Sequence, residues 1–247
     1  MDFSLSARRL GISAAAGIVL LGLGYAVTLI LGLLSLQSPQ QPIGGWYFSI
    51  LELLILPIAL SAVVLMVAVH AWAPPGAKAY SLTALVFMGL LSGLTCSVHF
   101  VILTMGRQIA SADLARSALF LSFKWPSVAY ALDIVAWDVF FGLAMLFAAP
   151  VFSGGRLATS IRILMITSGV LALAGLSGVV VGDMQLRMIG VIGYAAMFPV
   201  VALLLAILFM RTEAVTNSGP RTVRLPREPR SLRRNTRRRR SQRADPA

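Results

Sequence analysis

Residues 46–72, WYFSILELLILPIALSAVVLMVAVHAW, form an apolar run whose only acidic side chain is Glu52. At a rise of about 1.5 Å per residue, a helix of this length covers a hydrocarbon core of about 30 Å. Membrane-spanning strands are shorter and alternate in polarity, whereas this run is apolar all round. The stretch therefore predicts a transmembrane helix and excludes a β-barrel.

Five further runs have the same character, and hydrophobic residues make up 58% of the chain against 12% charged residues, with a mean hydropathy of +0.85. This composition excludes a water-soluble globular domain. We predict an all-α integral membrane protein, a six-transmembrane-helix bundle over residues 1–210 followed by a disordered Arg-rich tail over 211–247. The six spans are expected at 11–34, 46–72, 79–105, 127–152, 158–181 and 188–210.

The first run could also be a cleaved signal peptide, because Arg8 and Arg9 precede it. Its length and the lack of a small-residue cleavage site favour a retained helix. The two arginines place the N-terminus in the cytoplasm, and Lys78, Arg156 and Arg162 fall on the same side after even numbers of crossings. We therefore predict the cytoplasmic (inner) membrane, with both termini cytoplasmic.

The connection over residues 106–126 departs from this charge rule, because it places Arg107, Arg116 and Lys124 on the predicted outer side. Ser111 is a candidate N-cap, and apolar residues follow it at helical spacing. We expect a short helix here that lies on the outer interface or acts as a lid attracting anions.

Three ionisable residues are expected at one depth within three successive spans. Glu52, His99 and Asp133 each lie six residues from the predicted outer end of their span (52 − 46, 105 − 99 and 133 − 127), or about 9 Å along a helix. Charged groups inside a bilayer are costly, so each is expected to have a partner. These three residues form a candidate polar pocket in the outer half of the bundle.

Other polar residues surround this candidate pocket. Thr95 and Cys96 lie one turn from His99, and Arg107 lies two turns beyond it, so all three are added to the candidate pocket. Asp138 follows Asp133 by five residues, which in an α-helix places it about 140° away and predicts a different contact.

No cofactor is expected. His70 lies toward the opposite end of its span from His99, which argues against a haem held by both histidines, and the single cysteine excludes a multi-cysteine metal site. A zinc ion would need His99, Glu52 and Asp133 together, which is chemically feasible but a poor ligand set.

Three functions fit this arrangement. Histidine titrates near neutrality, so the candidate pocket could serve small-solute or ion transport or a proton relay. One alternative is a membrane-embedded hydrolase, with or without a bound metal ion, in which Ser97 or water is the nucleophile and Arg107 or Lys124 holds an anionic head group. The other is a structural or partner-binding membrane subunit. No catalytic motif supports the hydrolase, so an enzyme is the less favoured interpretation.

The tail and the small residues predict partners. The 12 arginines of residues 211–247 face only three acidic residues, and the block Arg237, Arg238, Arg239 and Arg240 predicts contact with anionic lipid head groups rather than nucleic acid. Residues at four-residue spacing allow close helix packing, within the chain or in a homo-oligomer: Gly89, Gly93 and Ser97, and Ala174, Gly178 and Gly182.

Residues 46–210, with the segments ILELLILPIALSAVVLMVAVHAWAPP, TCSVHFVILT and WPSVAYALDIVAWDVFFGLAMLFAAPVF, resemble bacterial multi-pass, six-helix membrane proteins with no assigned activity. The resemblance implies an integral membrane protein. It implies no catalytic or binding residue and does not include the tail.

Overall fold

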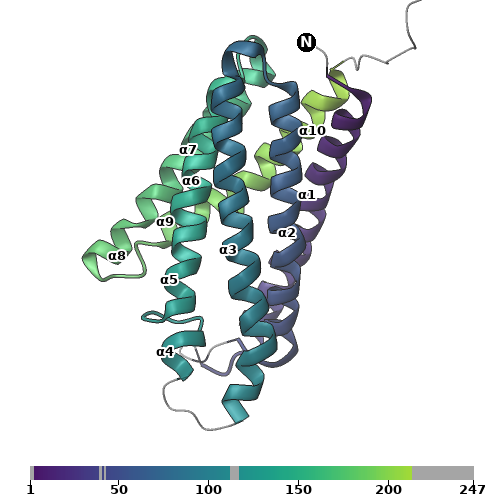
Figure 1. Cartoon of the computed structure of the whole chain (residues 1–247). Coiled ribbons are helices and arrows are strands. Elements are labelled where there is room, and N and C mark those ends of the chain that lie inside the picture. The colour runs from purple at the N-terminus through teal and green to yellow at the C-terminus, as the bar shows by residue number, and fades with distance from the viewer. Residues whose placement is uncertain (1–2, 39–40, 42, 112–116, 213–247) are drawn as a thin grey trace, which may run out of the picture. The chain divides into compact units, whose positions relative to one another are not determined.

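The fold is a bundle of helices, seen in a computed structural model that describes residues 3–38, 41, 43–111 and 117–212 (Figure 1). Side chains of residues 106–111, 117 and 118 are outside this description. The elements are α1 (Leu5–Leu34), α2 (Gly45–Trp72), η1 (Pro75–Ala77), α3 (Lys78–Ser111), α4 (Ser117–Leu121), α5 (Val128–Ile134), η2 (Val135–Phe140), α6 (Phe141–Ala148), η3 (Ala149–Val151), α7 (Gly155–Gly175), α8 (Ser177–Val181), α9 (Met188–Val191), η4 (Ile192–Met197) and α10 (Phe198–Arg211).

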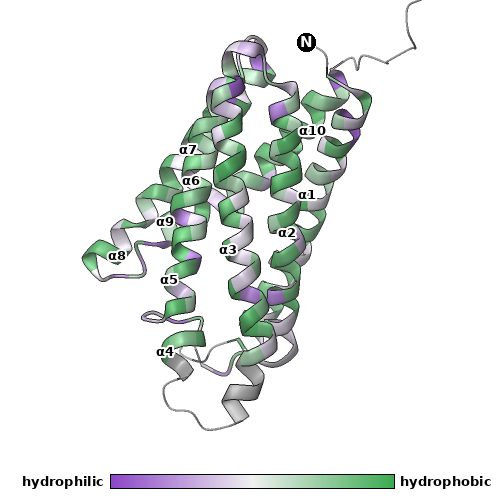
Figure 2. Cartoon of the chain, in the orientation of Figure 1, coloured by the Kyte–Doolittle hydropathy of each residue, from purple (hydrophilic) through white to green (hydrophobic). Residues whose placement is uncertain are grey.

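Six helices of the described residues are long and apolar enough to cross a membrane, which confirms the predicted number. They cover Leu5–Leu34, Gly45–Trp72, Pro75–Met105, Val128–Val151, Arg156–Val181 and Met188–Arg211. Hydrophobic residues line these helices over most of their length (Figure 2). The chain is therefore a helical protein of the multi-pass membrane type.

The long helices follow one another around the bundle in chain order, and the last packs against the first. α1 packs on α2, α2 on α3, α3 on η2 and α6, and α6 on α7, while α10 contacts both α7 and α1. Arg8 at the start of α1 donates a 2.6 Å hydrogen bond to the carbonyl oxygen of Met210 near the end of α10. These two helix ends therefore lie at one end of the bundle, called here the N-terminal end; the opposite end, beside α4, is called the α4 end.

Two boundaries differ from the sequence prediction. α1 begins at Leu5 rather than residue 11, because the hydroxyl of Ser4 caps it by accepting a hydrogen bond from the amide of Ala7. α3 continues to Ser111, so Ser111 ends a helix instead of starting one. The short helix expected in this connection is α4, and residues 112–116 before it lie outside the described residues.

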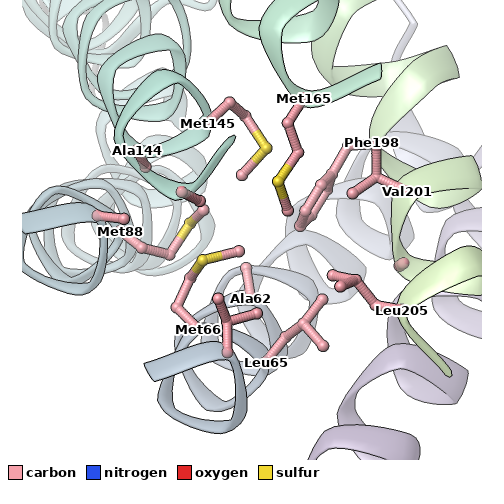
Figure 3. Packing of buried hydrophobic residues seen from close by; sticks show 14 of the residues in the cluster. Ala62, Leu65, Met66, Met88, Ala144, Met145, Met165, Phe198, Val201 and Leu205 are labelled. Atoms are coloured by element: carbon pink, nitrogen blue, oxygen red, sulfur yellow. The ribbon is translucent and has the colours of Figure 1, made fainter. Parts of the chain in front are cut away.

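The core fills the N-terminal half of the bundle with methionine and other apolar side chains. Met66, Met88, Met145 and Met165 are fully buried and meet Phe198 and Leu205 at the centre (Figure 3). α2, α3, α6, α7 and α10 each contribute to this packing. The side chains labelled at this centre in Figure 3 are all apolar and are contributed by several helices.

Glycines allow α6 and α7 to cross at short distance. A Cβ atom added at Gly169 would lie 2.7 Å from the carbonyl oxygen of Gly142, which is closer than real Cβ atoms approach. The predicted close-packing residues of the third span behave differently, since Gly89 and Gly93 have no neighbour within 4 Å of an added Cβ and are exposed. A homo-oligomer through that face stays a prediction.

We expect Gly169→Ala to lower the midpoint of thermal unfolding in detergent by roughly 5 °C, because the added methyl must push apart the two backbones at an overpacking cost of about 1–3 kcal/mol. Gly93→Ala is the matched control. It adds the same methyl where nothing lies within 4 Å and should leave the midpoint unchanged or raise it slightly. Equal midpoints for the two variants would contradict the close crossing of α6 and α7.

Candidate functional site

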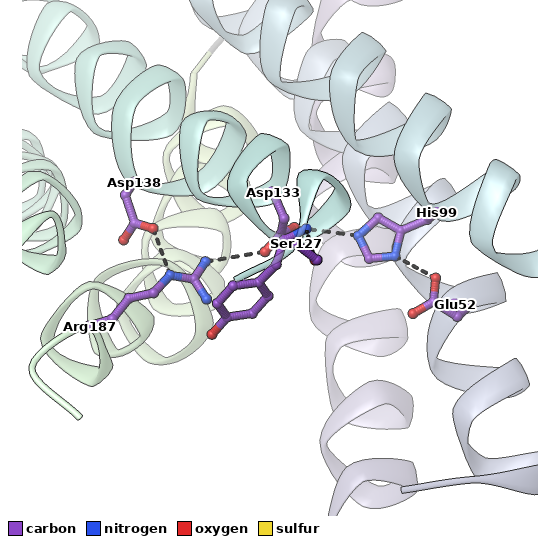
Figure 4. Close-up of polar contacts among 7 residues, drawn as sticks. Glu52, His99, Ser127, Asp133, Asp138 and Arg187 are labelled. Atoms are coloured by element: carbon purple, nitrogen blue, oxygen red, sulfur yellow. Dashed lines mark hydrogen bonds and ion pairs between the residues drawn. The ribbon is translucent and has the colours of Figure 1, made fainter. Parts of the chain in front are cut away.

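Five ionisable side chains form a continuous chain across the α4 half of the bundle (Figure 4). Glu52 comes from α2, His99 from α3, Asp133 from α5, Asp138 from η2, and Arg187 directly precedes α9. All five are buried, with between 0% and 6% of each residue exposed. We call these five residues the polar chain.

His99 links the two carboxylates at one end of the polar chain. Its Nδ1 lies 2.8 Å from Oε2 of Glu52, and its Nε2 lies 3.5 Å from Oδ1 of Asp133. The imidazole therefore stands between the two carboxylates. The structure thus brings together Glu52, His99 and Asp133, the three residues expected at one depth.

This geometry requires a proton between His99 and Asp133. A neutral imidazole has one N–H, and if Nδ1 donates it to Glu52, the bare Nε2 faces a carboxylate oxygen. Two acceptors repel each other unless one of them is protonated. A proton on Nε2 or on Asp133 removes the conflict, so the described geometry places a proton on one of these two residues.

Arg187 links the other two carboxylates. Its Nε donates to Oδ2 of Asp138 at 3.0 Å, and one terminal nitrogen donates to Oδ2 of Asp133 at 3.2 Å. The guanidinium also lies over the ring of Tyr130, with its central carbon 4.7 Å from the ring centroid. Asp133 is thus shared by His99 and Arg187, and it connects the two halves of the polar chain.

The prediction that Asp138 makes a separate contact is wrong, because residues 135–140 form a π-helix. In an α-helix, residues five apart point about 140° away from each other. A π-helix bonds each residue to the fifth along, which brings side chains five apart closer to one face. Asp133 and Asp138 therefore reach the same guanidinium.

Glycines make room for this arrangement. A Cβ atom at Gly175 would lie 2.5 Å from Oδ1 of Asp138, and one at Gly190 would also collide with that oxygen. A Cβ at Gly178 would lie 2.8 Å from the backbone nitrogen of Arg187. The small residues of the fifth span thus pack against the Arg187 segment of the same chain.

Arg187 was not predicted as a member of the site, because its position in a connection suggested an exposed charge. Burial alone lowers the pKa of its guanidinium, but attraction to Tyr194, Asp138 and Asp133 raises the pKa above its ordinary value. The guanidinium therefore stays charged. Glycines on both sides of Arg187, at 178 and 190, were the available signal that its backbone packs closely.

A cavity of about 300 Å³ adjoins the polar chain. His99, Asp133 and Arg187 form its polar wall, and α1 lines the opposite part with Gly22, Tyr25 and Leu29. The remaining lining is mostly apolar and aromatic: Ile18, Ala26, Ile55, Ile58, Phe123, Trp137, Val191, Tyr194, Ala195, Phe198 and Pro199. The volume is within the range of small-molecule sites, about 300–1,000 Å³.

Other predicted pocket residues lie outside the polar chain. Thr95 is fully buried, and its hydroxyl has no hydrogen-bond partner among the described residues. Cys96 is half-buried, with its sulfur 4.0 Å from the carbonyl oxygen of Leu56. Neither lines the cavity. The backbone of Arg107 belongs to α3, but its side chain lies outside the described residues.

The geometry argues against the candidate zinc site. The two carboxylates bind opposite nitrogens of the His99 ring, so one metal ion cannot contact all three residues. No group of three or more His, Cys, Asp or Glu side chains among the described residues is arranged to hold a metal. The structure also does not support Ser97 as the nucleophile of a hydrolase, because Ser97 is exposed and donates to the carbonyl of Gly93 instead of meeting His99.

Comparisons with protein-family models, with curated proteins and with solved structures gave no match for this chain. The chemistry of the site therefore follows from its own atoms.

We expect Arg187→Gln to destabilise the protein strongly, by roughly 3–5 kcal/mol, because it leaves two buried carboxylates facing each other. Arg162→Gln, at an exposed position of α7, is the control and should have little effect. Denaturant or thermal unfolding in detergent measures both.

The double variant Arg187→Gln, Asp138→Asn removes the cation and one of the facing charges together. It should recover part of the stability lost by Arg187→Gln alone, since fewer buried charges lack a partner. Additive losses in this double-mutant cycle would contradict a direct pairing of Arg187 with Asp138.

Proposed function

We propose that this chain is a proton-linked transport protein of the cytoplasmic membrane, in which the polar chain exchanges protons while a small solute or ion occupies the adjoining cavity. The observation that carries the proposal is the position of His99. Its ring lies between two carboxylates and also forms part of the cavity wall. An imidazole can hold or release a proton at either ring nitrogen, which is the chemistry that a proton relay between two carboxylates needs.

Charge distribution supports an orientation with the N-terminal end in the cytoplasm. Arg8 and Arg9 lie at this end, as does Arg211 at the end of α10. At the α4 end, Arg187 is neutralised by Asp133 and Asp138, so the free positive charges of that end are Lys124 and the two arginines of the same connection, against Arg8, Arg9, Lys78, Arg156, Arg162 and Arg211 at the N-terminal end. The positive-inside rule then favours cytoplasmic termini and a cavity in the outer half. In this orientation the tail, with Arg237–Arg240, meets the anionic lipids of the cytoplasmic leaflet.

Transport requires that the closed half of the bundle can open. The core between the cavity and the N-terminal end is apolar and contains four buried methionines, which are flexible and tolerate repacking. We propose that the described conformation has the cavity accessible from the α4 half, and that a second conformation opens the methionine core.

We expect His99→Gln to abolish pH-driven solute or proton movement in proteoliposomes, because glutamine keeps hydrogen-bonding capacity but cannot carry a proton between Glu52 and Asp133. His70→Gln is the matched control. His70 is bonded to Ser81 at 2.8 Å near the other end of α2 and should tolerate the change without loss of flux. Measurement uses a pH-sensitive dye trapped inside the vesicles.

Unchanged flux in His99→Gln would refute the proton relay. Lost flux in both histidine variants, with equally lowered unfolding midpoints, would instead favour a structural or partner-binding subunit, in which the polar chain only holds the helices in register.

A further inference from the structure

The walls and the charge of the cavity together indicate the chemistry of its occupant. Aliphatic side chains such as Ile18, Leu29 and Ile58 form much of the lining, while the polar groups are confined to one wall. A fully hydrated inorganic ion would place its water shell against these apolar side chains, which cannot bond to it. An amphipathic molecule, with one charged group and an apolar body, matches both parts of the lining.

The net charge of the polar chain, which includes two carboxylates behind the cavity wall, favours a cation. Glu52, Asp133 and Asp138 carry three negative charges when ionised, and Arg187 carries one positive charge. The sum is −1 when the additional proton is on His99 or Asp133 and −2 once that proton is released, so the polar chain is anionic in either state. Arg187 is already held by two carboxylates and by the ring of Tyr130, which leaves little of its charge for an anionic ligand.

Aromatic rings add a second attraction for a cation. Trp137 and Tyr194 line the cavity with ring centroids 5.2 Å apart, and Tyr25 and Phe123 line it from α1 and from the segment before α5. The faces of such rings attract organic cations, including quaternary ammonium groups. The carboxylate of Asp133 and the aromatic rings therefore both attract a cation.

The cavity reaches the side of the bundle. Ala26 of α1 and Ala195 of η4 both line it and are both exposed. α1 packs against α10 toward the N-terminal end, whereas α9 and η4 pack against α7, and α9 diverges from α1 in Figure 1. In a membrane, an opening on this side faces lipid, where an amphipathic molecule concentrates.

We infer that the cavity binds an amphipathic organic cation, which enters from the bilayer between α1 and the α9–η4 segment and is held by Asp133. This inference rests on the proposed transport function and names its substrate class. A proton on His99 or Asp133 lowers the negative charge that attracts the cation, so proton and cation exclude each other. The titratable and charged groups around this point are Tyr25, Glu52, His99, Tyr130, Asp133, Asp138, Arg187 and Tyr194.

The test is equilibrium binding of radiolabelled tetraphenylphosphonium to the full chain in lipid nanodiscs, with no pH gradient. We expect saturable binding that falls at least about tenfold in affinity with Asp133→Asn and weakens at acidic pH. Tetraphenylborate, which has the same shape and the opposite charge, should not compete. Competition by the borate, or unchanged affinity in a folded Asp133→Asn variant, would overturn the cation site.

Lateral entry is tested with a pair of adjacent substitutions. Ala195→Trp places a large side chain where the cavity meets the surface, whereas Ala196 is exposed but does not line the cavity. We expect Ala195→Trp to slow tetraphenylphosphonium association about tenfold and Ala196→Trp to leave it unchanged. Equal association rates would overturn entry at this point, and this comparison does not depend on the stability of the Asp133 variant.

The proton relay and the cation site can be refuted independently of each other. Saturable cation binding in a protein that moves no protons would retain the cation site and refute the proton relay. Proton movement through His99 without saturable cation binding would retain the relay and refute the substrate class.

Discussion

The α4 half of the bundle depends on the ion-paired guanidinium of Arg187. It bonds Asp133 and Asp138 while only 5% of the residue is exposed. Removing one partner from a buried ion pair costs much more than the pair contributes over an apolar replacement. Once these charges are inside an apolar bundle, α5, η2 and the start of α9 must therefore remain together.

The backbone is adapted to this requirement in two ways. The π-helix η2 turns Asp138 toward the guanidinium that Asp133 also binds. Gly175 and Gly190 leave space for the Asp138 carboxylate, one oxygen of which has no hydrogen-bond partner among the described residues. A π-turn and an unsatisfied buried oxygen both reduce stability, and such features concentrate at functional sites. This is the physical reason to regard the polar chain as more than a structural link.

Much of the architecture could be predicted from the sequence, because a long run that is apolar all round crosses a membrane as a helix. The number of such runs then gives the number of crossing helices. The shared depth of Glu52, His99 and Asp133 was also accessible, since a constant rise per residue converts position into depth. The contacts of Asp138 and Arg187 could not be predicted from the sequence, because no pattern indicated the π-helix and a charged residue at the end of a span is normally solvated. The cavity depends on how α1 and α9 diverge, which is a tertiary property.

Asp133 is the point at which the proposed coupling of proton and ligand would occur. Asp133 is the only carboxylate of the polar chain that lines the cavity, and it is also the one shared by His99 and Arg187. In the function proposed above, a cation bound to Asp133 would compete with the proton between Asp133 and His99 and would weaken the ion pair of Asp133 with Arg187. Arg187 directly precedes α9, and α9 contacts η4, which contacts α10 in the methionine core, so the proposed coupling has a continuous path of packed elements. The proposed ligand and the proton would thus meet at one side chain, Asp133, whose partner Arg187 leads into the elements that pack on the methionine core.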